Sequence, residues 1–174
     1  EKGYWLEMNG DNDTQSLKLY EQAIRLSPRW VLANYFAGRS NGYIHNPDKA
    51  ITYFKNAIDL DSSFLPTYLA LGQSFNKGTK EGNFWFEKYV EKMKEYIRNH
   101  PGKVPVTYYN YLGNSLSCLG RWEEAEDALL VGEALSNHSY YRIYSNLGFV
   151  YRAMKKYEDS AKAFKKAISL SPLT

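Results

Sequence analysis

The feature of this sequence that most constrains its fold is a short phrase that returns at fixed intervals. Residues 20–28 read YEQAIRLSP, residues 54–62 read FKNAIDLDS, and residues 164–172 read FKKAISLSP. The first two copies are 34 residues apart. A chain with such a period builds one structural unit repeatedly, and each unit buries its apolar face against its neighbours. We therefore expect a stacked array rather than a domain built around one central core.

A second phrase, in which an apolar residue precedes glycine, recurs with a similar period and comes before the copies at 54–62 and 164–172. Its glycines are Gly38, Gly72, Gly113 and Gly148, with Gly38 to Gly72 spanning 34 residues and Gly113 to Gly148 spanning 35. No alternating strand pattern of useful length is present, so the pattern predicts ten helices and no sheet. Asn46, which precedes Pro47, and Asn83 are predicted to cap helix N-termini.

Together these phrases resemble the tetratricopeptide repeat family. Its signature places a Leu-Gly pair in a first helix, then a small residue, an aromatic residue and Ala in a second helix before a closing Pro. The last repeat fits best, with Leu147, Gly148, Tyr151, Ser160, Phe164, Ala167 and Pro172. The resemblance covers nearly the whole chain and implies an all-α, right-handed α-solenoid of about five helix-turn-helix repeats. The five repeats are expected to form a single array over residues 1–174. Their approximate bounds are 1–30, 31–64, 65–105, 106–140 and 141–174.

Two repeats depart from the family pattern. Gly72 to Gly113 spans 41 residues, so the third repeat carries an insertion of about seven residues. Its second helix is expected to be longer and bulkier, with Tyr89 and Met93 among the positions that pack. The first repeat is truncated, because residues 3–9 supply only two helical turns.

The ends of the chain suggest a relation to something larger. The sequence starts at Glu1 without a methionine, so its start appears trimmed. Near the other end, Ile168 and Leu170 are expected to lack a packing partner, because a stable array usually finishes with a polar capping helix. We therefore expect a segment of a longer repeat protein, or self-association through open repeat ends.

Composition excludes several classes of function. The net charge of +3 is small, and basic residues mix with acidic ones, so nucleic acid is not an expected partner. No apolar run approaches the ~20 residues that span a bilayer. Cys118 is the single cysteine and forms no internal disulfide, which favours a reducing compartment such as the cytoplasm without fixing the location.

The sequence shows no catalytic motif. His45, His100 and His138 fall in predicted loops, with no Cys or carboxylate at metal-ligand spacing. No nucleophile–base pair and no glycine-rich phosphate loop is present. We expect no enzyme activity, no cofactor and no metal.

The family resemblance also implies where binding takes place, because the first helices of successive repeats line a concave groove. Projected onto this sequence, the groove residues are Tyr35, Arg39, Gln73, Lys77, Asn110, Asn114, Arg142, Asn146, Phe149 and Arg152. The charged members are all cationic, and Asn amides both donate to and accept from a peptide backbone. The resemblance thus predicts a protein-interaction scaffold for an acidic peptide or a terminal carboxylate. A chaperone-tail receptor is not expected, because Asn110 stands where that clamp has Lys.

Other interpretations stay open. Arg39 and Lys77 are alternatively solvated helix surface. Seven tyrosines in the last two repeats are expected mainly to pack between repeats, with a binding patch as the alternative. These are Tyr108, Tyr109, Tyr111, Tyr140, Tyr141, Tyr144 and Tyr151. As functions, a self-assembly module and a docking or regulatory region of a larger enzyme compete with the peptide scaffold.

Overall fold

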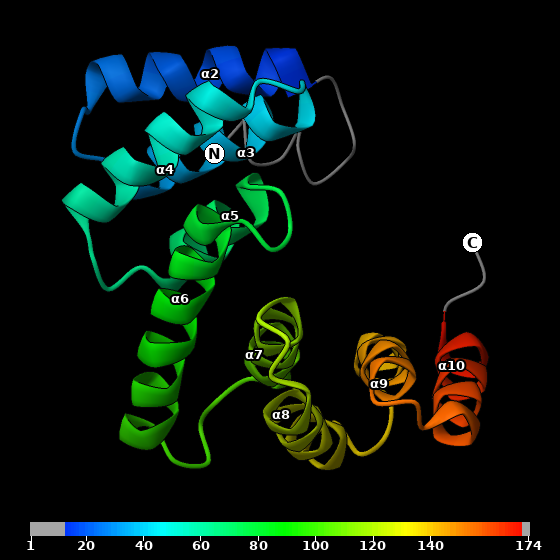
Figure 1. Ribbon diagram of the computed structural model, residues 1–174. Helices are drawn as coiled ribbons and strands as arrows, with labels where there is room; N and C mark the ends of the chain where they lie inside the picture. Colours follow the sequence, from blue (N-terminus) through cyan, green and yellow to red (C-terminus); the bar gives the residue numbers. More distant parts are fainter. Residues whose placement is uncertain (1–12, 172–174) are drawn as a thin grey trace. The chain divides into compact units, whose positions relative to one another are not determined.

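The computed structural model describes residues 13–171, which form nine α-helices and, over that range, no strand (Figure 1). The helices are α2 (Asp13–Leu26), α3 (Val31–Tyr43), α4 (Pro47–Leu60), α5 (Leu65–Ser74), α6 (Lys80–Asn99), α7 (Val106–Cys118), α8 (Trp122–Leu135), α9 (Tyr141–Ala153) and α10 (Tyr157–Leu170). The predicted helix at 3–9 and the closing Pro172 lie outside the described residues. The all-helical prediction holds for the described part of the chain.

The chain divides into two compact units, Glu1–Trp85 and Phe86–Thr174, called here the first and second units. The boundary falls inside α6, which begins in the first unit and continues in the second. The arrangement of five repeats as one array therefore stays a prediction.

In the first unit, the close crossing of α3 and α4 depends on a glycine. The ring of Phe54 lies so near Gly38 that a Cβ built on this glycine would come within 2.6 Å of it. Phe54 is buried with Ala50 and Leu71 in one core cluster. A small residue on one helix thus makes room for an aromatic ring on the next, which gives the dense packing typical of protein interiors.

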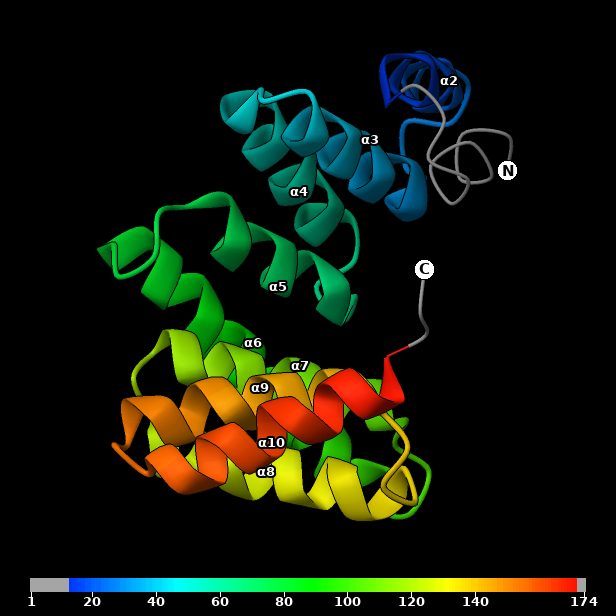
Figure 2. The same cartoon turned by 90° about the vertical axis from the view of Figure 1, so that its right-hand side faces the viewer.

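The second unit repeats this arrangement twice. Gly113 of α7 faces Leu129 of α8, and Gly148 of α9 faces Phe164 of α10; a Cβ added to these glycines would lie 2.5 and 2.7 Å from the facing side chain. Ser160 adds a hydrogen bond from its hydroxyl to the Gly148 carbonyl at 2.8 Å. Figures 1 and 2 show α7 to α10 lying alongside one another. At Gly38, Gly113 and Gly148, the repeated apolar–Gly phrase therefore marks the point where two helices of a hairpin cross closely.

Of the two predicted helix caps, one is confirmed in its position and the other is wrong. Asn46 is the N-cap residue of α4 and Pro47 its first residue, although the Asn46 side chain makes no capping hydrogen bond. By contrast, α6 begins at Lys80, so Asn83 lies inside the helix. Thr79 takes the capping role, because its hydroxyl accepts the Gly82 backbone N–H at 3.2 Å.

The insertion in the third repeat lengthens α6, as predicted. This helix has 20 residues, whereas α4, α8 and α10 have 14 each. Tyr89 stands where the family has a small residue and Met93 where it has an aromatic one, and both are fully buried. The added length and bulk therefore enter the core of the second unit.

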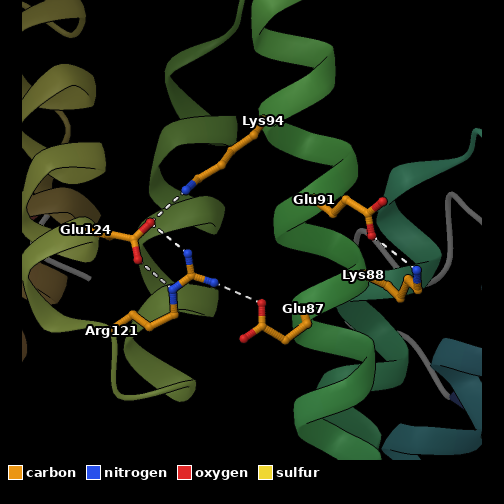
Figure 3. Close-up of polar contacts among 6 residues, drawn as sticks. All are labelled: Glu87, Lys88, Glu91, Lys94, Arg121 and Glu124. Atoms are coloured by element: carbon orange, nitrogen blue, oxygen red, sulfur yellow. Dashed lines mark hydrogen bonds and ion pairs between the residues drawn. The ribbon is translucent and has the colours of Figure 1, made fainter.

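An ion cluster joins α6 to the start of α8 (Figure 3). The Arg121 guanidinium holds both carboxylate oxygens of Glu124, at 2.6 and 2.7 Å, and reaches Glu87 at 2.9 Å. Lys94 adds a bond to Glu124 at 2.7 Å. The hydrogen bonds from Arg121 and then Lys94 lower the pKa of Glu124 from 4.5 to about 2. The cluster thus connects the long helix to its neighbour by charge as well as by packing.

Candidate binding surfaces

A cleft of about 380 Å³ lies among α3, α4 and α5 in the first unit, called here the α3–α5 cleft. Ala50 and Phe54 of α4 and Leu69 of α5 give it an apolar floor. Arg39 of α3 and Gln73 of α5 supply polar groups. Among the described residues that line this cleft, none is Asp or Glu. The cleft therefore combines an apolar interior with a single formal charge, which is positive.

Arg39 is held in place by aromatic neighbours. Its guanidinium donates a hydrogen bond to the Tyr43 hydroxyl. The guanidinium carbon also lies 5.5 Å from the Tyr43 ring centroid and 5.9 Å from that of Phe36. Cation–π contacts of this kind orient the guanidinium without neutralising its charge.

Tyr35 is likewise fixed by packing. Its ring centroid lies 5.2 Å from that of Phe36, 5.9 Å from that of Phe54 and 5.3 Å from that of Phe64. Edge-to-face contacts with Phe36 and Phe64 favour one ring orientation. Tyr35 therefore forms a preformed wall of the cleft.

The structure brings three of the predicted groove residues together and leaves a fourth elsewhere. Tyr35, Arg39 and Gln73 all line the α3–α5 cleft. Lys77 does not lie on the first helix of its repeat, because α5 ends at Ser74. It belongs to a turn in which the Thr79 N–H bonds the Asn76 carbonyl at 3.2 Å. The helical path has already ended, because Phe75 is extended with a ψ of 155°. The positive φ of 83° at Gly78 suits the turn that follows.

In the second unit, two predicted backbone clamps bind each other instead. The Asn146 side-chain amide donates to the Asn110 side-chain oxygen at 2.9 Å. Asn110 is only 4% exposed, so it serves the packing of α7 against α9 rather than an open groove. Asn114, one turn further along α7, is partly exposed.

The remaining predicted residues lie on α9. The Arg142 guanidinium carbon is 5.6 Å from the Tyr141 ring centroid, and that of Arg152 is 5.1 Å from the Phe149 ring centroid. Phe149 is itself exposed and meets Phe164 edge-on. This helix therefore presents two arginines, each resting on an aromatic ring, to the surroundings.

A groove that sequence reasoning missed lies between α8 and α10, called here the α8–α10 groove, with a volume of about 240 Å³. Tyr144, Leu147 and Tyr151 of α9 form its floor. Burial, and then bonding to Glu133, raises the pKa of Tyr144 to about 12; burial, and then the charge and bonding of Glu126, does the same for Tyr151. The predicted groove residues were taken from the concave faces of first helices, and Tyr144 and Tyr151 entered only as an alternative binding patch. The i, i+3, i+7 stripe that they form with Leu147 on α9 is the signal for this groove.

The described part of the chain also bears on metal binding and on membrane spanning. Within residues 13–171, no cluster of His, Cys, Asp and Glu is suited to hold a metal ion. Over that range, no helix has the length and apolar character needed to cross a membrane.

Comparisons with known proteins agree with the repeat pattern. Residues 106–130 and 141–172 match family models described as tetratricopeptide repeat. A search of curated proteins by sequence gives no significant match. These matches fall on the second unit, where the signature is most regular.

Solved structures resemble the chain over nearly its full length. A thermophilic TPR protein from Thermus thermophilus has a TM-score of 0.73 at 21% identity, covering 98% of this chain and 88% of that one. A MamA crystal structure has a TM-score of 0.63 at 21% identity, with coverages of 98% and 94%. MamA from Desulfovibrio magneticus RS-1 has a TM-score of 0.68 at 14% identity, with coverages of 97% and 90%. These likenesses confirm the predicted fold class, an all-α solenoid of helical hairpins.

Proposed function

Because this chain belongs to the tetratricopeptide repeat family, we propose that it is a protein-interaction scaffold that binds an acidic partner segment in the α3–α5 cleft. The fold supports the general role, since helical repeat arrays present extended surfaces to other proteins. The acidic character of the segment and its place in this cleft are the specific content of the proposal.

The observation that carries the proposal is the combination of an apolar floor with the Arg39 guanidinium in one cleft, whose described lining contains no carboxylate. Arg39 can pair with a carboxylate through two parallel N–H···O bonds, and such pairs are stronger than neutral hydrogen bonds. Phe54 and Leu69 lie in the same cleft and can receive an apolar side chain. The ligand is therefore a segment in which a carboxylate, from a side chain or a chain end, stands close to a large apolar residue.

The test begins with selection from a random peptide display library on the wild-type protein. Gly42 lines the cleft, and a Cβ added there meets nothing within 4 Å, so Gly42→Leu is chosen to place an apolar side chain in the cleft. Arg39→Glu reverses the charge at the same site. Arg29→Glu, on an exposed residue of the same unit outside the cleft, is the matched control.

We expect the selected peptides to be acidic with a large apolar residue, and to bind wild type and Arg29→Glu alike. Gly42→Leu and Arg39→Glu should each weaken binding about tenfold or more, the scale for losing a buried charged contact. All variants must first show equal helicity and equal melting temperature. Selection of neutral or basic peptides, or unchanged binding to Gly42→Leu, would show that the cleft is not the site.

Self-association is a second candidate, supported by one observation on α10. Ile168 is 73% exposed, and Tyr157 on the same helix is also exposed. Such apolar groups are often found at interfaces between proteins. Sedimentation velocity over a concentration series tests this candidate. Association that Ile168→Glu abolishes would support it, whereas a monomer at every concentration would exclude it.

A further inference from the structure

The α8–α10 groove has the shape to receive a large apolar side chain. Its floor is the stripe of Tyr144, Leu147 and Tyr151, and Leu130 and Ala163 face each other from its two walls. A volume of about 240 Å³ is several times the ~30 Å³ that a water molecule occupies in the liquid. Leu130 is partly exposed, so this apolar interior opens to the surroundings.

The acidic groups of the α8 wall already have partners. Glu133 accepts a hydrogen bond from the Tyr144 hydroxyl and lies 3.3 Å from His138. Glu126, nearer the start of the same helix, accepts a hydrogen bond from the Tyr151 hydroxyl and forms an ion pair with Lys156 at 2.8 Å. Glu126 is therefore neutralised by Lys156, whereas Glu133, whose side chain is 22% exposed, keeps its negative charge on the α8 side of the groove.

The α10 wall carries two lysines one helical turn apart. Lys166 lies over the Tyr144 ring, with its Nζ 6.0 Å from the centroid. Lys162 is 75% exposed and approaches Asp159 only at 3.4 Å. Pairs between exposed side chains contribute little and exchange partners readily. Asp159 lines the groove on the same wall, so the α10 edge carries two positive charges and one negative charge and faces Glu133 on the α8 wall. An acidic ligand is therefore expected to pair along the α10 edge.

We propose that the α8–α10 groove docks an amphipathic helix of a partner protein, with an apolar residue between Leu130 and Ala163 and acidic residues paired to Lys162 and Lys166. The spacing argues for a helix, because residues i and i+4 of one helix match the i and i+4 positions of another lying beside it. The site uses the second helices of two repeats and lies wholly in the second unit. It is thus a second binding surface, independent of the α3–α5 cleft.

The experiment uses two synthetic helical peptides and the whole chain. One peptide has leucines along one face and glutamates one turn apart along the edge of that face; the other replaces each glutamate with lysine. Binding is measured by fluorescence anisotropy. The test variant is the double charge reversal Lys162→Glu with Lys166→Glu. Lys165→Glu is the matched control, because this exposed residue lies on the same helix but does not line the groove.

We expect the acidic peptide to bind wild type and Lys165→Glu equally, and to lose about tenfold or more in affinity for the double variant. The lysine peptide should bind the double variant better than it binds wild type, and this rescue also shows that the variant is folded. Leu130→Asp should weaken both interactions. Failure of the acidic peptide to bind wild type, or equal weakening by Lys165→Glu, would overturn the proposal.

The result of this experiment can be distinguished from the result for the α3–α5 cleft, because the two sites are tested with different variants. Arg39→Glu and Gly42→Leu should leave binding of the acidic helix unchanged, and Lys166→Glu should leave the cleft peptides unaffected. If Arg39→Glu removes helix binding as well, the peptide binds in the cleft and the α8–α10 groove is not its site.

Discussion

Asn146 donates a side-chain hydrogen bond to the side-chain oxygen of Asn110 across 2.9 Å, and this bond joins α9 to α7. The two residues are 36 positions apart, close to one repeat period, so they stand at nearly equivalent places in successive repeats. A buried amide needs a partner, and each of these amides is the other's. The pair therefore fixes how the first helix of one repeat packs on the next.

We expect Asn146→Ala to lower the free energy of unfolding by about 1–3 kcal/mol, because it leaves the buried Asn110 oxygen without its partner. Urea denaturation with a double-mutant cycle over Asn110→Ala and Asn146→Ala measures the coupling. Asn114→Ala, on a partly exposed residue of α7, controls for the loss of an amide and should change stability by less than about 0.5 kcal/mol. Zero coupling would mean that the bond contributes nothing in solution.

The helix crossings predict opposite effects on stability for two glycine-to-alanine substitutions. Gly148→Ala places a Cβ 2.7 Å from the Phe164 ring, and such overpacking costs about 1–3 kcal/mol. Gly42→Ala meets nothing within 4 Å, and alanine's helix propensity stabilises by up to about 1 kcal/mol. Thermal unfolding, monitored by circular dichroism, should give a lower melting temperature for Gly148→Ala than for wild type. Gly42→Ala should not lower the melting temperature. Equal shifts would show that Phe164 moves aside.

The ion cluster predicts a loss of stability in acid. The folded-state pKa of Glu124, about 2, lies below its ordinary value of 4.5. The stabilisation is therefore complete above about pH 4.5 and disappears as the pH falls toward 2. Its size is at most about 1 kcal/mol, because the side chains are 32–54% exposed and solvent screens their charges.

Urea denaturation across that range should show the advantage of wild type over Glu124→Gln shrinking with falling pH. Glu91→Gln removes an exposed pair with Lys88 on another side of α6 and serves as the control (Figure 3). A constant difference between wild type and Glu124→Gln would contradict the assigned cluster.

The raised pKa of Tyr144 predicts a loss of stability at alkaline pH. Its folded-state pKa, about 12, lies above the ordinary 10.0, because burial and then the bond to Glu133 disfavour ionisation. The stabilisation is present below pH 10 and is lost as the pH rises toward 12. The advantage of wild type over Tyr144→Phe, measured by urea denaturation, should narrow over this range. The exposed Tyr157 provides the control variant Tyr157→Phe, and an advantage that widens for Tyr144 would reverse the assignment.

The candidate sites show which binding residues could be predicted from the sequence and which could not. It predicted Tyr35, Arg39 and Gln73 for one surface, and all three line the α3–α5 cleft. It also put Lys77 on a first helix, but α5 ends at Ser74, where Phe75 becomes extended, and Lys77 lies in the turn that follows. It did not predict the α8–α10 groove, because that groove needs three helices in place before its walls exist.

The sequence by itself determined the repeat, the helical class and the glycines at which hairpins close. These are local or periodic properties, since a glycine opposite a large apolar side chain recurs at the same crossing, as at Gly38, Gly113 and Gly148. Only the tertiary structure decided that Asn110 and Asn146 bind each other and that Arg39 rests on Tyr43 above an apolar floor. A side chain's partner depends on the register between packed helices, and composition and spacing along one chain do not specify that register.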